Sequence, residues 1–92
     1  MEKAAIHSSH PNITKRLKRA EGHLRTIVAM MEENRSCLEV AQQLHAVEMA
    51  VSAAKKLLVH DHIEHCLERA VRPTSTGAAK ALSEFKEITK YL

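Results

Sequence analysis

The sequence predicts an all-α fold of three helices, the second of which is far longer than a small domain usually contains. Its 92 residues include only two glycines and two prolines, so few positions interrupt helical structure. Apolar residues recur three and four positions apart, and no stretch alternates β-branched with polar residues as a strand would. We therefore expect a single helical domain over residues 12–92, preceded by a flexible N-terminal arm over residues 1–11.

The first predicted helix begins after Pro11, with Asn12 or Thr14 as its cap, and ends near Glu33. On a 100° helical wheel six apolar residues share one side. These residues are Ile13, Leu17, Ala20, Leu24, Ile27 and Met31. Between Asn12 and Arg25 this segment also carries five cations and one acid, Glu21, which gives that stretch a local charge of +4. The cations are Lys15, Arg16, Lys18, Arg19 and Arg25. They form either an ordinary solvated face or a surface that binds phosphate groups.

The second predicted helix begins at Ser36–Glu39, where a serine followed three positions later by a glutamate fits the capping box. It continues to Arg72, because Pro73 disfavours helical geometry in the residue before it. About 35 residues correspond to roughly 50 Å. An apolar seam follows this length through Leu38, Val40, Ala41, Leu44, Val47, Val51, Ala54, Leu58, His62 and Cys66. The first helix can cover only part of it. We expect a second copy, packed antiparallel, to cover the rest and form a four-helix bundle.

A third, short helix is predicted from about Ala78 to Tyr91, after a linker rich in threonine and serine. No segment approaches the roughly 20 apolar residues that cross a bilayer. No secretory signal is apparent either, so we expect a cytoplasmic protein with no membrane partner.

His62 and Cys66 stand four positions apart, a spacing that points an imidazole and a thiolate the same way along a helix. Such a pair can chelate Zn(II), Ni(II), Co(II) or Cu(I), although a buried cysteine beside a half-exposed histidine is also common. Cys37 lies roughly 37 Å away along the same helix. An antiparallel dimer with its two-fold axis near Ala50 brings Cys37 of one copy beside His62 and Cys66 of the other, twice per dimer.

His7 and His10 lie in the predicted N-terminal arm. Either the arm is simply disordered, or one of these histidines supplies a fourth ligand when a metal binds.

Four segments together resemble the CsoR/RcnR family of bacterial repressors over about residues 12–72. They are Lys15–Gly22, Cys37, Gln42–Leu44 and His62–Cys66. The resemblance implies an all-α dimer that associates into a tetramer, binds operator DNA without a helix-turn-helix, and leaves the DNA when an inducer binds.

The resemblance also implies a ligand set. The inducer-site residues of the family match Cys37, His62 and Cys66, a Cys/His/Cys set like that of the copper(I) sensors. An added histidine, here His7 or His10, is similar to the nickel and cobalt sensors. Some copper sensors have a tyrosine where this chain has Ser36.

Two further positions of the family bear on inducer and DNA. The formaldehyde-sensing branch shares a reactive cysteine at Cys37, but it lacks a cysteine at the last ligand position, where this chain has Cys66, and usually has proline where this chain has Glu2. Many members carry an arginine where this chain has Glu48. Lys55 and Lys56 follow on the same helix and are candidate DNA contacts in its place.

We therefore predict a metal-responsive repressor that binds operator double-stranded DNA in the apo form. Its inducer is one transition-metal ion per subunit, Ni(II)/Co(II) or Cu(I), with no organic cofactor. The alternatives are a formaldehyde-responsive repressor that uses Cys37, and a helical metal-binding protein that does not bind DNA. An enzyme is disfavoured, because the sequence shows neither a glycine-rich phosphate loop nor a set of nucleophile, base and orienting residue.

Overall fold

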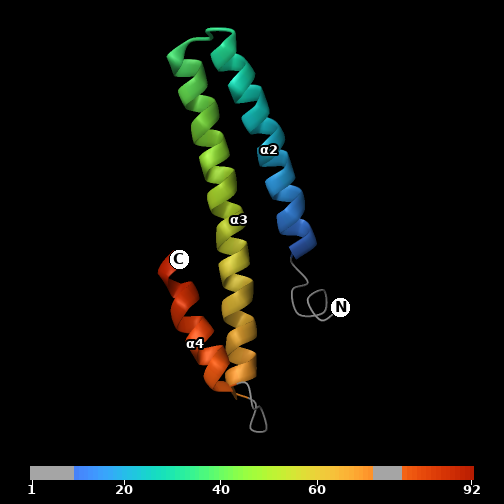
Figure 1. Ribbon diagram of the computed structural model, residues 1–92, viewed down its shortest axis with the longest axis vertical. Helices are drawn as coiled ribbons and strands as arrows, with labels where there is room; N and C mark the ends of the chain where they lie inside the picture. Colours follow the sequence, from blue (N-terminus) through green and yellow to red (C-terminus); the bar gives the residue numbers. More distant parts are fainter. Residues whose placement is uncertain (1–9, 72–77) are drawn as a thin grey trace. The chain divides into compact units, whose positions relative to one another are not determined.

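The computed structural model describes residues 10–71 and 78–92 of the chain (Figure 1). They form three α-helices, α2 (His10–Glu32), α3 (Cys37–Val71) and α4 (Ala78–Ile88), and a 3-10 turn, η1 (Thr89–Tyr91). No strand occurs in these two ranges, so the all-α, three-helix prediction is confirmed. At 35 residues, α3 also has the predicted length. Within these ranges, no helix combines the length and the apolar character needed to cross a membrane.

The chain divides into two compact units. Pro11–Lys55 holds α2 from its second residue onward and the first half of α3, and it is called the hairpin unit below. The second half of α3 from Lys56, together with α4 and η1, belongs to the other unit, called the C-terminal unit.

The first turn of α2 begins at His10, two residues before the Asn12 cap that the sequence suggests. Pro11 lies in this first turn, where its missing N–H removes no intrahelical hydrogen bond. His10 and Pro11 are therefore helical and do not belong to the predicted flexible arm, whose residues 1–9 lie outside the described part of the chain.

A Schellman motif ends α2. The N–H of Arg35 donates to the carbonyl of Met30 at 3.0 Å, and the N–H of Asn34 donates to the carbonyl of Met31 at 3.1 Å. Asn34 has a φ of 58°, the left-handed conformation that this motif requires and that asparagine tolerates better than most residues. The break that the sequence predicts at residues 34–36 is thus a sharp and hydrogen-bonded turn.

The predicted capping box begins α3. The N–H of Glu39 donates to Ser36 Oγ at 3.1 Å, and the Ser36 hydroxyl donates to the Glu39 carboxylate at 3.2 Å. The Arg35 guanidinium donates to the same carboxylate at 2.7 Å. This hydrogen bond and the arginine charge, followed by the bond from Ser36, hold the pKa of Glu39 below its usual value. The turn and the cap together make the joint between α2 and α3, residues 30–40.

Apolar side chains hold α2 against the first half of α3. Ile27 and Met30 of α2 form one buried cluster with Val40 and Val47 of α3. Along α2 the buried residues are Ile13, Ala20, Ile27 and Met30. The predicted apolar side was therefore only half right, because Leu17, Leu24 and Met31 are exposed.

The two flanks of this hairpin differ in chemistry. The residues three positions after Ile13, Ala20, Val40 and Val47 are polar or small, namely Arg16, His23, Gln43 and Ala50. On that flank His23 Nε2 of α2 bonds Gln43 Oε1 of α3 at 2.5 Å. Residues four positions after the buried stripe are apolar and exposed on both helices. They are Leu17, Leu24 and Met31 of α2 and Leu44 and Val51 of α3, and we call them the open face. Since residues i+3 and i+4 flank a helical stripe on opposite sides, the open face lies on the side away from the His23–Gln43 bond.

Candidate functional site

Three potential metal ligands meet in the C-terminal unit. His62 and Cys66 of α3 and Glu84 of α4 each offer one donor atom, and these atoms lie within 4.8 Å of one another. The side chain of Cys66 is only 1% exposed, whereas His62 and Glu84 are half-buried. An imidazole nitrogen, a thiol and a carboxylate within this distance are a donor set that fits a transition-metal ion. We call these three residues the ligand cluster.

The i, i+4 spacing that places His62 beside Cys66 is visible in the sequence, but Glu84 was not predicted. It lies three positions after Ala81, which is fully buried on the side of α4 that faces inward. A polar residue on the buried face of a short amphipathic helix was the available signal. Which residues of α3 it would meet could not be read from the sequence, because residues 72–77 separate the two helices.

An open pocket of about 230 Å³ adjoins the ligand cluster. His62 and the carboxylates of Glu84 and Glu87 line it, with Ser83, Ile88 and Tyr91 completing the wall. Two carboxylates give this pocket a negative potential, which favours the entry of a cation. The pocket thus connects the half-buried His62 to solvent on the side where Glu84 lies.

The other predicted ligands lie elsewhere. Cys37 is an exposed free thiol in the first turn of α3, in the hairpin unit. It stands seven positions before Leu44 and fourteen before Val51, so it extends the open face of the hairpin to the N-terminal end of α3. His10 is the half-buried first residue of α2, and His7 lies outside the described residues. Within one described chain, the ligand cluster includes none of these three.

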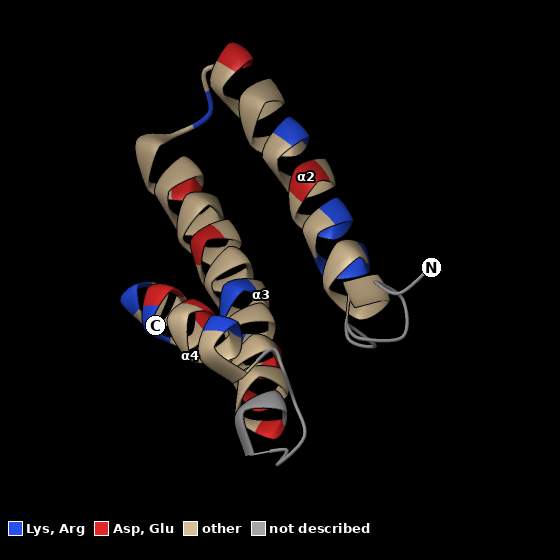
Figure 2. Cartoon of the chain, turned by 60° about the horizontal axis from the view of Figure 1, so that its bottom comes forward, with Lys and Arg blue, Asp and Glu red and all other residues tan. Residues whose placement is uncertain are grey.

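The predicted DNA contacts of α2 are all on the surface. Figure 2 shows lysines and arginines along the helix, and every one of the five candidate side chains is exposed. They are Lys15, Arg16, Lys18, Arg19 and Arg25. Arg25 approaches Glu21 of the same helix at 4.0 Å. On α3, Lys55 and Lys56 are exposed as well, and the exposed Glu48 is 3.6 Å from His45.

Comparison with known proteins gives a consistent result. The profile of the family described as metal-sensitive transcriptional repressors matches residues 9–91. The copper-sensing transcriptional repressor RicR of Mycobacterium tuberculosis is 40% identical over 73 residues, 79% of this chain and 76% of RicR. The copper-sensing transcriptional repressor CsoR of Bacillus subtilis is 39% identical over 82 residues, 85% of this chain and 79% of CsoR. No solved structure matches.

The family match extends from before α2 through η1, so it includes the basic helix, Cys37 and the ligand cluster in one alignment. The family and the two relatives named above are described as transcriptional repressors and not as enzymes. The chain therefore belongs to the CsoR/RcnR family and is a metal-sensitive transcriptional repressor.

Proposed function

We propose that the apo protein binds operator DNA through the cations of α2 and releases it when an inducer metal binds at a site shared between two copies of the chain. The observation that carries this proposal is the presence, in one small chain, of an exposed basic helix and of the ligand cluster His62, Cys66 and Glu84. Cationic side chains on one helix supply the sequence-independent part of DNA affinity, which falls steeply with salt.

The shared site follows from the open face. A helix hairpin that leaves the five large apolar residues of its open face exposed gains free energy by burying them against a second copy. In an antiparallel pairing of two α3 helices about an axis near Ala50, Cys37 of one copy and the His62/Cys66 pair of the other stand at equal distances from the axis. Cys37 then adds a third soft donor to the ligand cluster. A four-helix dimer with two such sites results, and pairing of two dimers gives the tetramer.

Copper(I) is the inducer that this donor set suits best. Cys37, His62 and Cys66 supply two thiolates and an imidazole, which are the soft donors that Cu(I) prefers. The two relatives named above are copper-sensing repressors. In this arrangement the carboxylate of Glu84 accepts a hydrogen bond from His62 and orients its ring.

Nickel(II) or cobalt(II) is the second candidate, favoured by one specific observation. Both ions accept oxygen ligands more readily than Cu(I) does, and Glu84 brings a carboxylate into the ligand cluster. His7 or His10 would complete such a site.

The joint between α2 and α3 explains how the closing of the site affects DNA binding. Cys37 is the first residue of α3, three positions after the left-handed Asn34, and hydrogen bonds secure the turn on either side of it. A displacement of Cys37 toward a partner's ligands therefore moves the C-terminal end of α2 with it. The spacing of the cations on α2 changes, and DNA affinity falls by a coupling free energy of about 1–3 kcal/mol.

The test is an anaerobic titration of the reduced protein with Cu(I), Ni(II) and Co(II), with absorption spectra and binding to promoter fragments followed together. We expect one Cu(I) per subunit, bound without visible colour, and loss of DNA binding at the same stoichiometry. Release by Ni(II) or Co(II), with intense thiolate charge-transfer bands, would instead assign the second candidate.

Substitution of Cys37 gives the matching control. Cys37→Ala keeps the α2 cations and should bind promoter DNA as the wild type does, yet no metal should release it. A Cys37→Ala protein that is released normally would contradict the shared site. Release of the wild type by formaldehyde and by no metal would support the alternative in which the exposed Cys37 thiol reacts with an electrophile.

A further inference from the structure

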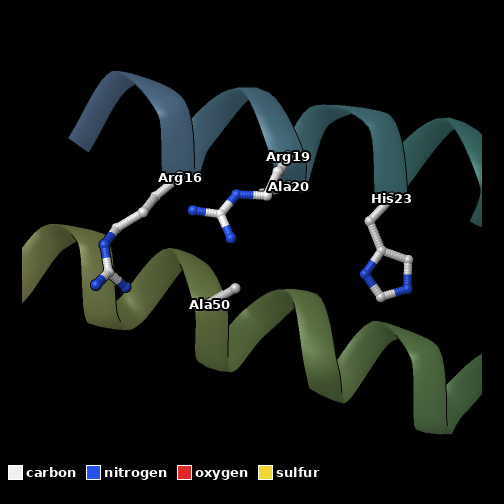
Figure 3. Close-up of a pocket in the computed structure, with 5 residues that line it drawn as sticks. All are labelled: Arg16, Arg19, Ala20, His23 and Ala50. Carbon is white, nitrogen blue, oxygen red and sulfur yellow. The ribbon is translucent and has the colours of Figure 1, made fainter. Parts of the chain in front are cut away.

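The polar flank of the hairpin contains a pocket lined by two of the cations to which the proposed function assigns DNA binding. It has a volume of about 160 Å³ and lies entirely within the hairpin unit. Its lining residues are Arg16, Arg19, Ala20 and His23 of α2 and Ala50 of α3. In Figure 3 the side chains of Arg16, Arg19 and His23 descend from α2 toward α3, and the methyl group of Ala50 points up between the helices.

The charges of this pocket are all of one sign. It is lined by two guanidinium groups and no carboxylate. Neither Arg16 nor Arg19 forms an ion pair with another residue in the part of the chain that the structure describes, whereas Arg25 on the same helix approaches Glu21. Two guanidinium groups that share a pocket repel each other unless an anion lies between them. Their forked donors match the oxygens of phosphate better than a lysine would.

The imidazole of His23 is held in place beside the two guanidinium groups. Its Nε2 bonds Gln43 Oε1, and since an amide oxygen only accepts, Nε2 carries the proton. The Nδ1 atom is the other ring nitrogen, and Figure 3 shows one ring nitrogen turned toward the guanidinium of Arg19. The titratable and charged groups that line the pocket with it are Arg16 and Arg19, and α3 contributes only the neutral Gln43 and Ala50 on this flank.

We propose that Arg16, Arg19 and His23 form a binding site for a single phosphate group, and that in the repressor this group belongs to the DNA backbone. The small side chains of Ala20 and Ala50 leave the space that the phosphate occupies. The assignment of the phosphate to DNA rests on the proposed function, but the phosphate site itself does not. The proposed site also gives two uncharged groups, the imidazole of His23 and the amide of Gln43, a role in positioning the duplex on the basic helix.

The test fills the pocket without changing its charge. Ala50→Leu places a larger side chain at its floor, and Ala53→Leu is the matched control, because Ala53 is exposed on the same helix and does not line the pocket. Light scattering establishes that both variants keep the oligomeric state of the wild type. His23→Leu is a second variant that removes the imidazole from the pocket wall and leaves the pocket floor intact.

Two probes are used. The ring signals of His23 are followed by NMR while inorganic phosphate replaces chloride at constant ionic strength. Promoter affinity is measured over a range of salt concentrations. We expect a saturable shift of the His23 signals with phosphate in the wild type and Ala53→Leu, and none in Ala50→Leu. We also expect promoter affinity about tenfold lower for Ala50→Leu and His23→Leu. In a plot of log affinity against log salt concentration, the slope should be shallower by about 0.9 for each DNA phosphate that the variant no longer neutralises.

The outcomes separate the two proposals. If Ala50→Leu and Ala53→Leu behave alike with both probes, the phosphate site is refuted while the repressor function stands. A phosphate response at His23 with unchanged promoter affinity would refute DNA as the source and identify a free phosphate compound instead. If the wild type binds no promoter yet shows the phosphate response, the proposed function fails and the site remains.

Discussion

Placing a charge on the open face should separate the two copies of the proposed dimer. Leu44 is 47% exposed in the single chain, so about half of its side chain is still available for burial. Complete burial of a leucine side chain contributes about 1.5–3 kcal/mol, and the exposed part therefore contributes roughly 0.7–1.4 kcal/mol. A two-fold dimer buries this side chain twice, so removing it raises the dissociation constant by about 10- to 100-fold. The carboxylates that Leu44→Glu introduces would add a desolvation penalty to this effect.

The assay is sedimentation equilibrium over a range of protein concentrations. Met49→Glu is the matched control, because Met49 is 58% exposed on the same helix but lies about 140° around it from Leu44. Dissociation should also abolish the shared site, so Leu44→Glu should lose the tight metal binding for which Cys37 of a second copy is needed. A Leu44→Glu protein that stays as strongly associated as Met49→Glu would refute the assignment of the open face to a second copy.

Three further predictions concern the ligand cluster and the joint. Glu84→Gln should leave the thiolate absorption of Cu(I)-loaded protein unchanged but weaken metal affinity by about tenfold or more, because an amide orients His62 less firmly; an altered thiolate spectrum would place Glu84 among the ligands. Asn34→Ala should destabilise the hairpin by about 1 kcal/mol in urea unfolding, since alanine disfavours the left-handed conformation, and Asn34→Gly should not. The pKa of Glu39 is lowered by Arg35, so its contribution to stability is complete above the usual carboxyl range and is lost as the pH falls. The stability difference between the wild type and Glu39→Gln should therefore shrink on acidification, and a constant difference would contradict the Arg35 pairing.

The ends of the helices were predictable because local chemistry determines them. Ser36 and Glu39 form a cap from residues only three positions apart, and Asn34 is one of the few residue types that tolerate a left-handed turn. The His62–Cys66 pair was predictable for the same reason, since one turn of helix separates the two side chains. The start of α2 was misplaced by two residues, because Pro11 can stand inside a first turn as well as before it. The third helix was predicted to Tyr91, but α4 ends at Ile88 and a 3-10 turn covers the last three of those residues.

Features that depend on how helices pack were harder to predict. A wheel groups Met31 with Ile13 and Ile27, yet it is Met30 that is buried, because Met30 packs with Val40 and Val47 of α3 while Met31 stays exposed. Glu84 joins the ligand cluster only because of where α4 packs, and no local spacing specifies that. The partner of Cys37 depends on a second copy of the chain. The sequence pattern of one chain indicates only that an apolar face is left uncovered, and it does not specify what packs against that face.

The two flanks of the hairpin differ in chemistry and therefore suit different binding partners. The i+4 flank is apolar, ends at Cys37 and suits a second copy, whereas the i+3 flank is cationic, holds the His23–Gln43 bond and suits phosphate. Both flanks are surfaces of the same pair of helices, which the cluster of Ile27, Met30, Val40 and Val47 and the joint at residues 30–40 hold together. A shift of Cys37 on the i+4 flank must therefore rotate or slide α2 relative to the phosphate groups on the i+3 flank. Binding at one flank can thus weaken binding at the other, although the two surfaces do not overlap. On this reasoning, loosening the joint with Ser36→Ala and Glu39→Ala together should weaken release of DNA more than it weakens DNA binding itself.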